Sequence, residues 1–327
     1  MIPSDVSVIV TVKNEASSIG NLLNSLQAQT RLPSEVVIVD GGSTDGTVER
    51  INLYRHKLPI KLLIQEGSNI SQGRNAAIAA ATGGIIASTD AGVRLVPHWL
   101  AELTRPLEED GSLDVVSGSF LPEPQTVFET AMGATVLPIL ADIKPDHFLP
   151  SSRSVAFRKE AWATLGGYPE WLDYCEDLVF DFALRDAGCK FSFAPQALAH
   201  FRPRSNLSAF WHQYFRYARG DGKADLWRKR HAIRYVTYLL VGPLLIVLGL
   251  VHHPLWWLVL LSGIAAYLWS PYRRLWPMTK RFSWRDRVKA ILWVPIIRVW
   301  GDVAKMAGYP VGVLWRMRHK RHGLGPA

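Results

Sequence analysis

One stretch of the chain decides its fold: Val36-Val37-Ile38-Val39-Asp40-Gly41-Gly42-Ser43-Thr44-Asp45-Gly46-Thr47. It opens with four β-branched residues, a pattern typical of a strand buried on both faces of a parallel sheet. The strand ends on Asp40, and two glycines then permit a tight turn close to a ligand. Ser43, Thr44 and Asp45 can cap a helix that starts near Thr47. An isolated Asp-Gly is also typical of a simple turn or cap, so the flanking segments decide what Asp40 does.

The preceding segment predicts a second strand that ends in the same way. Residues 6–12 are rich in valine and isoleucine and lead into Lys13-Asn14-Glu15. Apolar residues at helical spacing follow over 19–26, so the chain from residue 6 to Asp40 reads as a right-handed βαβ unit. A third strand is predicted over 60–64. Ligands bind beyond the carboxyl ends of such strands, where Glu15 and Asp40 lie.

Arg74 lies in the first turn of an alanine-rich helix predicted over 71–81. The helix dipole makes this a poor place for a cation, so we expect Arg74 to meet an anion. The alternative is a surface arginine in a local ion pair.

Further motifs follow in chain order. A buried strand over 85–89 ends at Asp90-Ala91-Gly92, and a helix begins with Glu176-Asp177, although carboxylates in a first turn can simply be dipole partners. Short strands are predicted over 190–193 and 198–201, the second with His200, and a lone histidine on such a strand is more often a core residue. An aromatic helix over 206–217 contains Gln213 and Arg216.

Charge divides the 327 residues unevenly. The net charge is +9, but residues 228–327 contain 17 Lys and Arg against two Asp, so the part before them is acidic overall. A nucleic-acid-binding protein would place its basic residues on the globular module, so we predict no nucleic-acid partner. The two cysteines imply no disulfide framework.

The basic tail flanks a run without Asp, Glu, Lys or Arg over 235–272. Its 38 residues suit two membrane helices that turn at His252-His253-Pro254, since one span needs about 20 apolar residues. A buried core hairpin is the alternative. Arginines on both flanks predict, by the positive-inside rule, a cell-membrane protein whose catalytic domain is cytoplasmic. Residues 288–315 carry a polar stripe of Arg298, Asp302 and Lys305, and this predicts an amphipathic helix in the headgroup plane.

Together these motifs resemble the family 2 glycosyltransferases, which have the GT-A fold. The resemblance rests on the following segments: 8–15, 39–47, Gly73-Arg74-Asn75, Thr89-Asp90-Ala91-Gly92, Gly166-Gly167-Tyr168-Pro169, Cys175-Glu176-Asp177 and Gln213-Tyr214-Phe215-Arg216-Tyr217. It implies an α/β fold with a mostly parallel, Rossmann-like sheet flanked by helices, followed by a helical membrane region. We therefore expect a catalytic domain over 1–227 and a membrane-associated region over 228–327.

The resemblance also implies roles for individual residues. Glu15 and Asp40 match the carboxylates that hold the nucleoside of a nucleotide-sugar donor, and Arg74 falls within the donor-binding set. Asp90 matches the first acid of the motif that carries Mg²⁺ or Mn²⁺. Asp177, with Glu176 beside it, matches the general base of an inverting transfer. Gln213 and Arg216 match a motif near the acceptor and the diphosphate.

Two departures from the family pattern bear on these roles. Gly92 replaces the second acid of the metal motif, which makes His200 a candidate auxiliary ligand. The motif at Gln213 ends in Tyr217 rather than tryptophan, which favours transfer of a single sugar to a saccharide or lipid-linked acceptor. Two alternatives stay open: a polyprenyl-phosphate glycosyltransferase, and a non-catalytic nucleotide-sugar-binding membrane protein. Membrane lipids are further expected partners.

Overall fold

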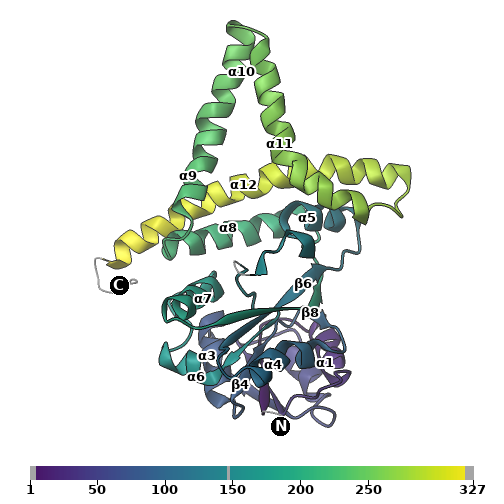
Figure 1. Ribbon diagram of the computed structural model, residues 1–327, viewed down its shortest axis with the longest axis vertical. Coiled ribbons are helices and arrows are strands. Elements are labelled where there is room, and N and C mark those ends of the chain that lie inside the picture. Colours follow the sequence, from purple (N-terminus) through teal and green to yellow (C-terminus); the bar gives the residue numbers. More distant parts are fainter. Residues whose placement is uncertain (1–4, 146–147, 321–327) are drawn as a thin grey trace. The chain divides into compact units, whose positions relative to one another are not determined.

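The strands between Val6 and Phe201 form one eight-stranded sheet with helices on both faces (Figure 1). The computed structural model describes residues 5–145 and 148–320, so the outer limits of the two predicted domains lie outside it. The chain divides into two units. The first extends to Glu123 and resumes over Ile139–Arg202, and the second contains Pro124–Pro138 and the residues from Pro203 onward.

The first unit contains the whole sheet. Its elements are β1 (Val6–Val12), α1 (Ile19–Gln27), β2 (Glu35–Asp40), α2 (Thr47–Asn52), β3 (Ile60–Ile64), α3 (Ile70–Ala80), β4 (Ile85–Ser88), β5 (Val93–Leu95), α4 (Trp99–Glu109), β6 (Val115–Pro122), the 3-10 turn η1 (Leu140–Asp142), β7 (Val155–Arg158), α6 (Lys159–Thr164), α7 (Glu176–Asp186) and β8 (Phe191–Phe201).

The strand order is β3-β2-β1-β4-β7-β6-β8-β5. The strands β3, β2, β1 and β4 are parallel neighbours, as predicted, whereas β7 pairs antiparallel with both β4 and β6. The sheet is therefore mixed. The two short strands predicted over 190–193 and 198–201 are one strand, β8, which pairs with β6 through a register shift between Ser117 and Ser119.

Alternate residues of each central strand feed two separate cores. Val8, Val10 and Ile38 pack with α1, α2 and α4 on one face, whereas Ile9 and Val37 pack with α3, α6 and α7 on the other. This double burial explains why the central strands are apolar without a polar alternation.

The second unit is helical. Its elements are α5 (Val127–Val136), α8 (Leu207–Lys223), α9 (Arg228–Val236), the π-helical segment η3 (Thr237–Val241), α10 (Gly242–Val251), α11 (Leu255–Met278) and α12 (Trp284–Lys320). The helix α8 belongs to this unit, although the predicted boundary at residue 227 assigned it to the catalytic domain. The helix α5 was not predicted from the sequence. The sequence feature that marks the start of α5 is its N-cap residue, Thr126, whose hydroxyl accepts a hydrogen bond from the Glu129 amide (3.1 Å).

Two helices of the second unit are long and apolar enough to cross a membrane: Arg228–Val251 and Leu255–Met278. They form a hairpin that turns at His252 to Pro254, as predicted (Figure 1). In each, only 6% of the apolar window is buried, which does not fit the alternative of a buried core hairpin. The predicted in-plane segment over 288–315 lies within the single helix α12.

Glycines let α8 and α12 approach closely. A Cβ atom on Gly308 would lie 2.1 Å from the Phe215 carbonyl oxygen, and one on Gly312 would lie 2.0 Å from that of Arg219. Since real Cβ atoms do not come so close to backbone, these positions accept only glycine unless the helices separate.

We predict that Gly312→Ala destabilises the protein by about 1–3 kcal/mol, because overpacking forces the two helices apart. Thermal unfolding of the detergent-solubilised protein should show a lower Tm. The matched control is Gly263→Ala in α11, where a Cβ atom meets nothing within 4 Å and the Tm should not fall. Equal Tm values for the two variants would contradict the packing described.

Candidate active site

The predicted carboxylates leave the sheet from one edge. The strands β1 and β2 are parallel with Val12 opposite Asp40, and β4 runs parallel to β1 on its other side. The loops that follow these three strands therefore begin at the same edge, and they carry Glu15, Asp40 and Asp90 respectively.

Hydrogen bonds join the first two loops. The Asn14 amide donates to the Ser43 hydroxyl (2.8 Å), and the Thr44 amide donates to the Asn14 side chain (2.9 Å). The Glu15 amide donates to the Thr47 hydroxyl (2.8 Å). Ser43, Thr44 and Asp45 were predicted to cap α2. The N-cap position is held by Gly46, and of the three side chains Asp45 accepts the amide of Thr47 at the start of α2 (3.1 Å), whereas the Ser43 hydroxyl binds the neighbouring loop.

Asp40 is buried, and only one of its two carboxylate oxygens accepts hydrogen bonds within the described residues. Its Oδ1 accepts hydrogen bonds from the Gly42 and Ser43 amides, both at 2.8 Å. Its Oδ2 is buried and, within the described part of the chain, has no hydrogen-bond partner. A buried acceptor without a donor is costly, so this oxygen is suited to an N–H or O–H group of a ligand. Glu15 is half-buried, and its carboxylate accepts from the Ser18 hydroxyl.

Arg74 meets an anion, as predicted, and that anion is a side chain. Its guanidinium forms an ion pair with Glu176 in the first turn of α7, and both side chains are buried. A second nitrogen of Arg74 lies 3.5 Å from Asp90 Oδ1. The Tyr168 ring covers the guanidinium, with its centroid 5.5 Å from Arg74 Cζ. Arg74 thus links the metal-motif position to the start of α7.

Burial raises the pKa of Glu176 to about 7, while the Arg74 guanidinium opposes the shift and the neighbouring Asp177 reinforces it. The folded pKa lies above the ordinary value of 4.5, so the folded state binds this proton more tightly than the unfolded state does. The contribution of Glu176 to stability is therefore largest at low pH and falls as the pH rises from about 4.5 to about 7.

Asp177 is partly exposed and follows directly on Glu176. Its Oδ1 accepts from the Leu178 amide (2.9 Å). The chain enters α7 through Cys175 in a left-handed conformation (φ 64°). One turn further on, the sequence analysis missed Asp181, which is buried with an Oδ2 that has no partner within the described residues. Burial, and then the charge of Asp177, hold the pKa of Asp181 well above its ordinary value.

Arg153 is a second residue that the sequence analysis missed. Its Nε lies 3.7 Å from Asp90 Oδ2, and its guanidinium stacks on the Phe201 ring at 4.6 Å. Asp90 therefore lies between two guanidinium groups, those of Arg74 and Arg153. In the sequence, Arg153 is simply an arginine that precedes a buried strand. That position does not indicate where the side chain of Arg153 points.

The role of His200 as an auxiliary metal ligand stays a prediction. Its neighbour on β8, Phe201, contacts Arg153, which lies beside Asp90. His200 lies near Arg94 and Glu123; burial and the Arg94 charge lower its pKa. Among the described residues, no group of three or more His, Cys, Asp and Glu side chains could hold a metal ion. If Asp90 binds a metal ion, it can supply carboxylate oxygens, and the remaining ligands would come from a substrate.

Gln213 and Arg216 lie on α8 in the second unit. The amide of Gln213 donates to the Tyr217 hydroxyl (2.7 Å) and accepts from Arg204 Nε (3.3 Å).

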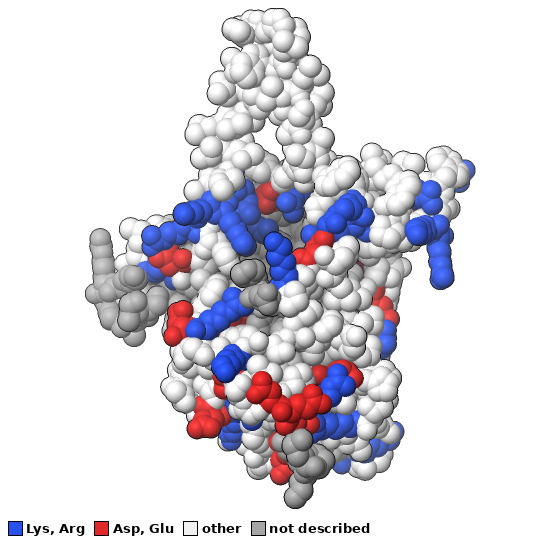
Figure 2. Space-filling model, in the orientation of Figure 1, with Lys and Arg blue, Asp and Glu red and all other residues white. Residues whose placement is uncertain are grey.

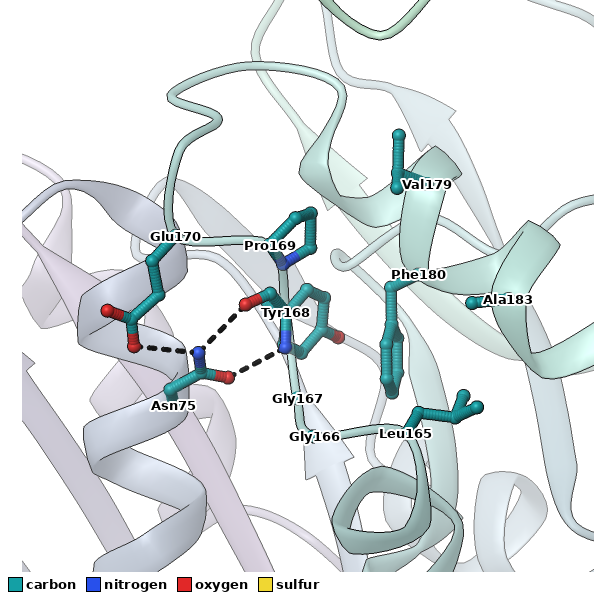
Figure 3. A pocket seen from close by; sticks show the side chains of 10 residues that line it. All are labelled: Asn75, Leu165, Gly166, Gly167, Tyr168, Pro169, Glu170, Val179, Phe180 and Ala183. Atoms are coloured by element: carbon teal, nitrogen blue, oxygen red, sulfur yellow. Dashed lines mark hydrogen bonds between the residues drawn. The ribbon is translucent and has the colours of Figure 1, made fainter. Parts of the chain in front are cut away.

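A cavity of about 420 Å³ lies beside the loop over 166–170. Figure 3 shows how Asn75 holds this loop: its amide donates to the Tyr168 carbonyl (2.9 Å) and to Glu170 (3.0 Å), and it accepts from the Tyr168 amide (2.8 Å). Gly167 has a φ of 91°, and a Cβ atom there would lie 2.6 Å from Asn75. None of the predicted carboxylates lines the cavity, so it is not the predicted donor site.

The comparisons with known proteins agree with this arrangement. Residues 7–158 match the sequence model of glycosyl transferase family 2. The chain carries a family 2 glycosyltransferase domain. This confirms the predicted family and the enzyme class.

Two curated relatives cover most of the chain. The succinoglycan biosynthesis protein ExoA of Rhizobium meliloti is 29% identical over 252 residues, which are 72% of this chain and 75% of that protein. The glycosyltransferase AglE of Haloferax volcanii is 27% identical over 249 residues, 72% of this chain and 80% of that protein.

Among solved structures, the mannosyltransferase PcManGT of Pyrobaculum calidifontis, in complex with GDP-Man and Mn²⁺, is similar with a TM-score of 0.58. The identity is 20%, and the match covers 96% of this chain and 88% of that one. The likeness confirms the predicted GT-A fold of the family 2 domain.

We predict that Arg74→Met destabilises the family 2 domain by about 3–5 kcal/mol at pH 8, because it leaves the buried Glu176 carboxylate uncompensated. The loss should be smaller at pH 5.5, where Glu176 is protonated. Denaturant unfolding at both pH values measures it. The double variant Arg74→Met/Glu176→Leu should recover part of the loss, and a loss in Arg74→Met that does not depend on pH would contradict the buried pair.

Proposed function

We propose that this protein is an inverting glycosyltransferase that moves a single sugar from a nucleotide-sugar donor to a saccharide or lipid-linked acceptor at a membrane. The observation that carries the proposal is the partly exposed Asp177 next to the buried Arg74–Glu176 pair. Arg74 belongs to the segment that matches family 2, and the pair joins this segment to the start of α7. A carboxylate on an otherwise buried helix start is positioned to accept a proton from an acceptor hydroxyl.

The donor would bind at the edge of the sheet through its nucleoside. The unsatisfied Oδ2 of Asp40 can accept an N–H from the base, and Glu15 leaves the neighbouring strand. Such a contact removes the cost of an unpaired buried oxygen, which makes Asp40 a source of affinity and of selectivity for the base. Arg74 is held by Glu176 and Asp90, so its part in donor binding would be indirect.

Asp90 would hold Mg²⁺ or Mn²⁺ together with the diphosphate of the donor. A divalent ion there would supply charge neutralisation for the departing nucleoside diphosphate. The guanidinium groups of Arg74 and Arg153 lie beside Asp90 and can add to that neutralisation. Gln213 and Arg216 are assigned to the diphosphate and acceptor by their motif alone.

The apolar hairpin supports a location at the cell membrane, with the catalytic domain on the cytoplasmic side where the basic flanks would lie. One relative is named for succinoglycan biosynthesis, which favours a cell-envelope or secreted polysaccharide as the product.

Two alternative functions differ from this proposal in how far they need Asp177 as a general base. A polyprenyl-phosphate acceptor needs little base catalysis, and a non-catalytic binding protein needs none.

We predict that Asp177→Asn lowers the transfer rate by about 10²- to 10⁴-fold while donor affinity persists, because it removes the base and keeps the shape. Initial rates and donor titrations on the purified protein measure both. Transfer near the wild-type rate would exclude Asp177 as the base and favour a phosphate acceptor, whereas absence of donor hydrolysis in the wild type would favour the binding protein.

We predict that donor binding, measured by calorimetry, requires Mg²⁺ or Mn²⁺ and is lost in Asp90→Ala, since Asp90 would hold the ion that neutralises the diphosphate. The matched control is Asp114→Ala, a carboxylate that accepts from the Lys190 amide elsewhere in the same unit. Donor binding and turnover that persist in EDTA would refute the metal role.

A further inference from the structure

The polar stripe of α12 faces its own hairpin. Arg298, Asp302 and Lys305 recur at i, i+4 and i+7 and so share one side of the helix. Asp302 Oδ1 accepts from Arg234 Nε of α9 (2.8 Å), and its Oδ2 accepts from the Tyr267 hydroxyl of α11. The Tyr238 hydroxyl of η3 also donates to Oδ2 (3.3 Å). We call these residues the hairpin-foot cluster; its members are Arg234, Tyr238, Tyr267, Arg298, Asp302 and Lys305.

Asp302 accepts hydrogen bonds from Arg234, Tyr238 and Tyr267, and neither Arg298 nor Lys305 is among these donors. Arg298 lies over the Tyr267 ring (4.6 Å to the centroid), and its buried Nε has no hydrogen-bond partner within the described residues. Lys305 lies over the Tyr214 ring (4.8 Å). The cluster thus sets three cations, Arg234, Arg298 and Lys305, against one carboxylate.

The charge of Lys305 is poorly compensated. Burial lowers its pKa to about 8, although Asp302 opposes the shift, and Arg234 and Arg298 lower it further. Asp221 also opposes the shift, but it acts more weakly and is hydrogen-bonded to His231 (3.1 Å). Lys305 is half-buried, so an anion beside it would stabilise its charged form.

The cluster lies at the foot of the apolar hairpin. Residues of η3 and α10 expose large apolar side chains, such as Leu240 (63%) and Leu250 (71%). Figure 2 shows the hairpin without charged side chains and Lys and Arg side chains gathered at its base. The π-helical turn at Thr237–Val241 lies at this level, and such irregular turns recur at functional sites. An anion that reaches the cluster can therefore carry a long apolar group along the hairpin.

We propose that the hairpin-foot cluster binds the phosphate or diphosphate group of a lipid-linked acceptor, with Arg298 and Lys305 as its main ligands. This inference rests on the proposed function for the identity of the acceptor. Guanidinium and ammonium groups form charge-assisted hydrogen bonds with phosphate oxygens, and the two side chains leave α12 about 10 Å apart along its axis, with Asp302 and Arg234 between them. The lipid chains would lie against the exposed apolar side chains of α10 and α11.

Binding of a polyprenyl diphosphate to the full-length protein in detergent micelles tests the proposal, with uncharged polyprenol, phosphatidylglycerol and inorganic phosphate as separate probes. Polyprenyl diphosphate should bind most tightly. Arg298→Gln and Lys305→Gln should each weaken its binding about 10-fold or more, since each removes charged hydrogen bonds. The matched control is Lys289→Gln on the same helix, whose side chain is 64% exposed and which should bind as the wild type does.

The charge-conserving variant Lys305→Arg should retain binding within about threefold, which separates lost charge from lost folding. Equal weakening in Lys289→Gln, or unchanged binding in both cluster variants, would overturn the proposal. Equal affinity for phosphatidylglycerol or inorganic phosphate would also overturn it, because the site would then select no acceptor. Donor hydrolysis, followed in parallel, reports on the proposed glycosyltransferase activity independently of this binding.

Discussion

The buried ion pair between Arg74 and Glu176 is the interaction on which the catalytic end of the sheet depends. It joins the second turn of α3 to the first turn of α7, and it therefore sets where Asp177 emerges. Each charge alone would be expensive in this apolar setting, so neither side chain can change without the other. The Tyr168 ring closes the pair from solvent, and Asn75 of α3 holds the loop that carries Tyr168. The helix α3 thus supplies both Arg74 and Asn75, the residue that holds the loop whose Tyr168 ring covers Arg74.

The second unit depends on a different constraint, the close approach of α8 and α12. Glycines on α12 bring the two backbones together, and this leaves little freedom to rotate α12 about its axis. The stripe of Arg298, Asp302 and Lys305 is consequently directed at the hairpin, where Arg234 and two tyrosines meet it. Small residues therefore determine where a polar site forms in a largely apolar unit.

Much of the fold could be predicted because strong local patterns agree with the final packing. The central strands are buried on both faces, so runs of valine and isoleucine predicted β1, β2 and β4 with their carboxyl-terminal acids. The structure was harder to predict where one local sequence pattern is compatible with two different structures. Ser43 and Thr44 have the composition of helix caps, yet they bind the loop at Asn14 because parallel pairing brings that loop alongside. The strand β8 was divided in two because its pairing with β6 tolerates a register shift.

The sequence by itself determined the family, the positions of the parallel strands and the edge at which Glu15, Asp40 and Asp90 lie, because these follow from short-range periodicity and from the rule that parallel strands end together. Only the tertiary structure decided the partners of the side chains. It paired Arg74 with Glu176, placed Arg153 beside Asp90 and faced the stripe of α12 toward the hairpin. Such pairings join residues far apart in the chain, and they depend on side-chain direction and packing, which the spacing of residues along one segment does not encode.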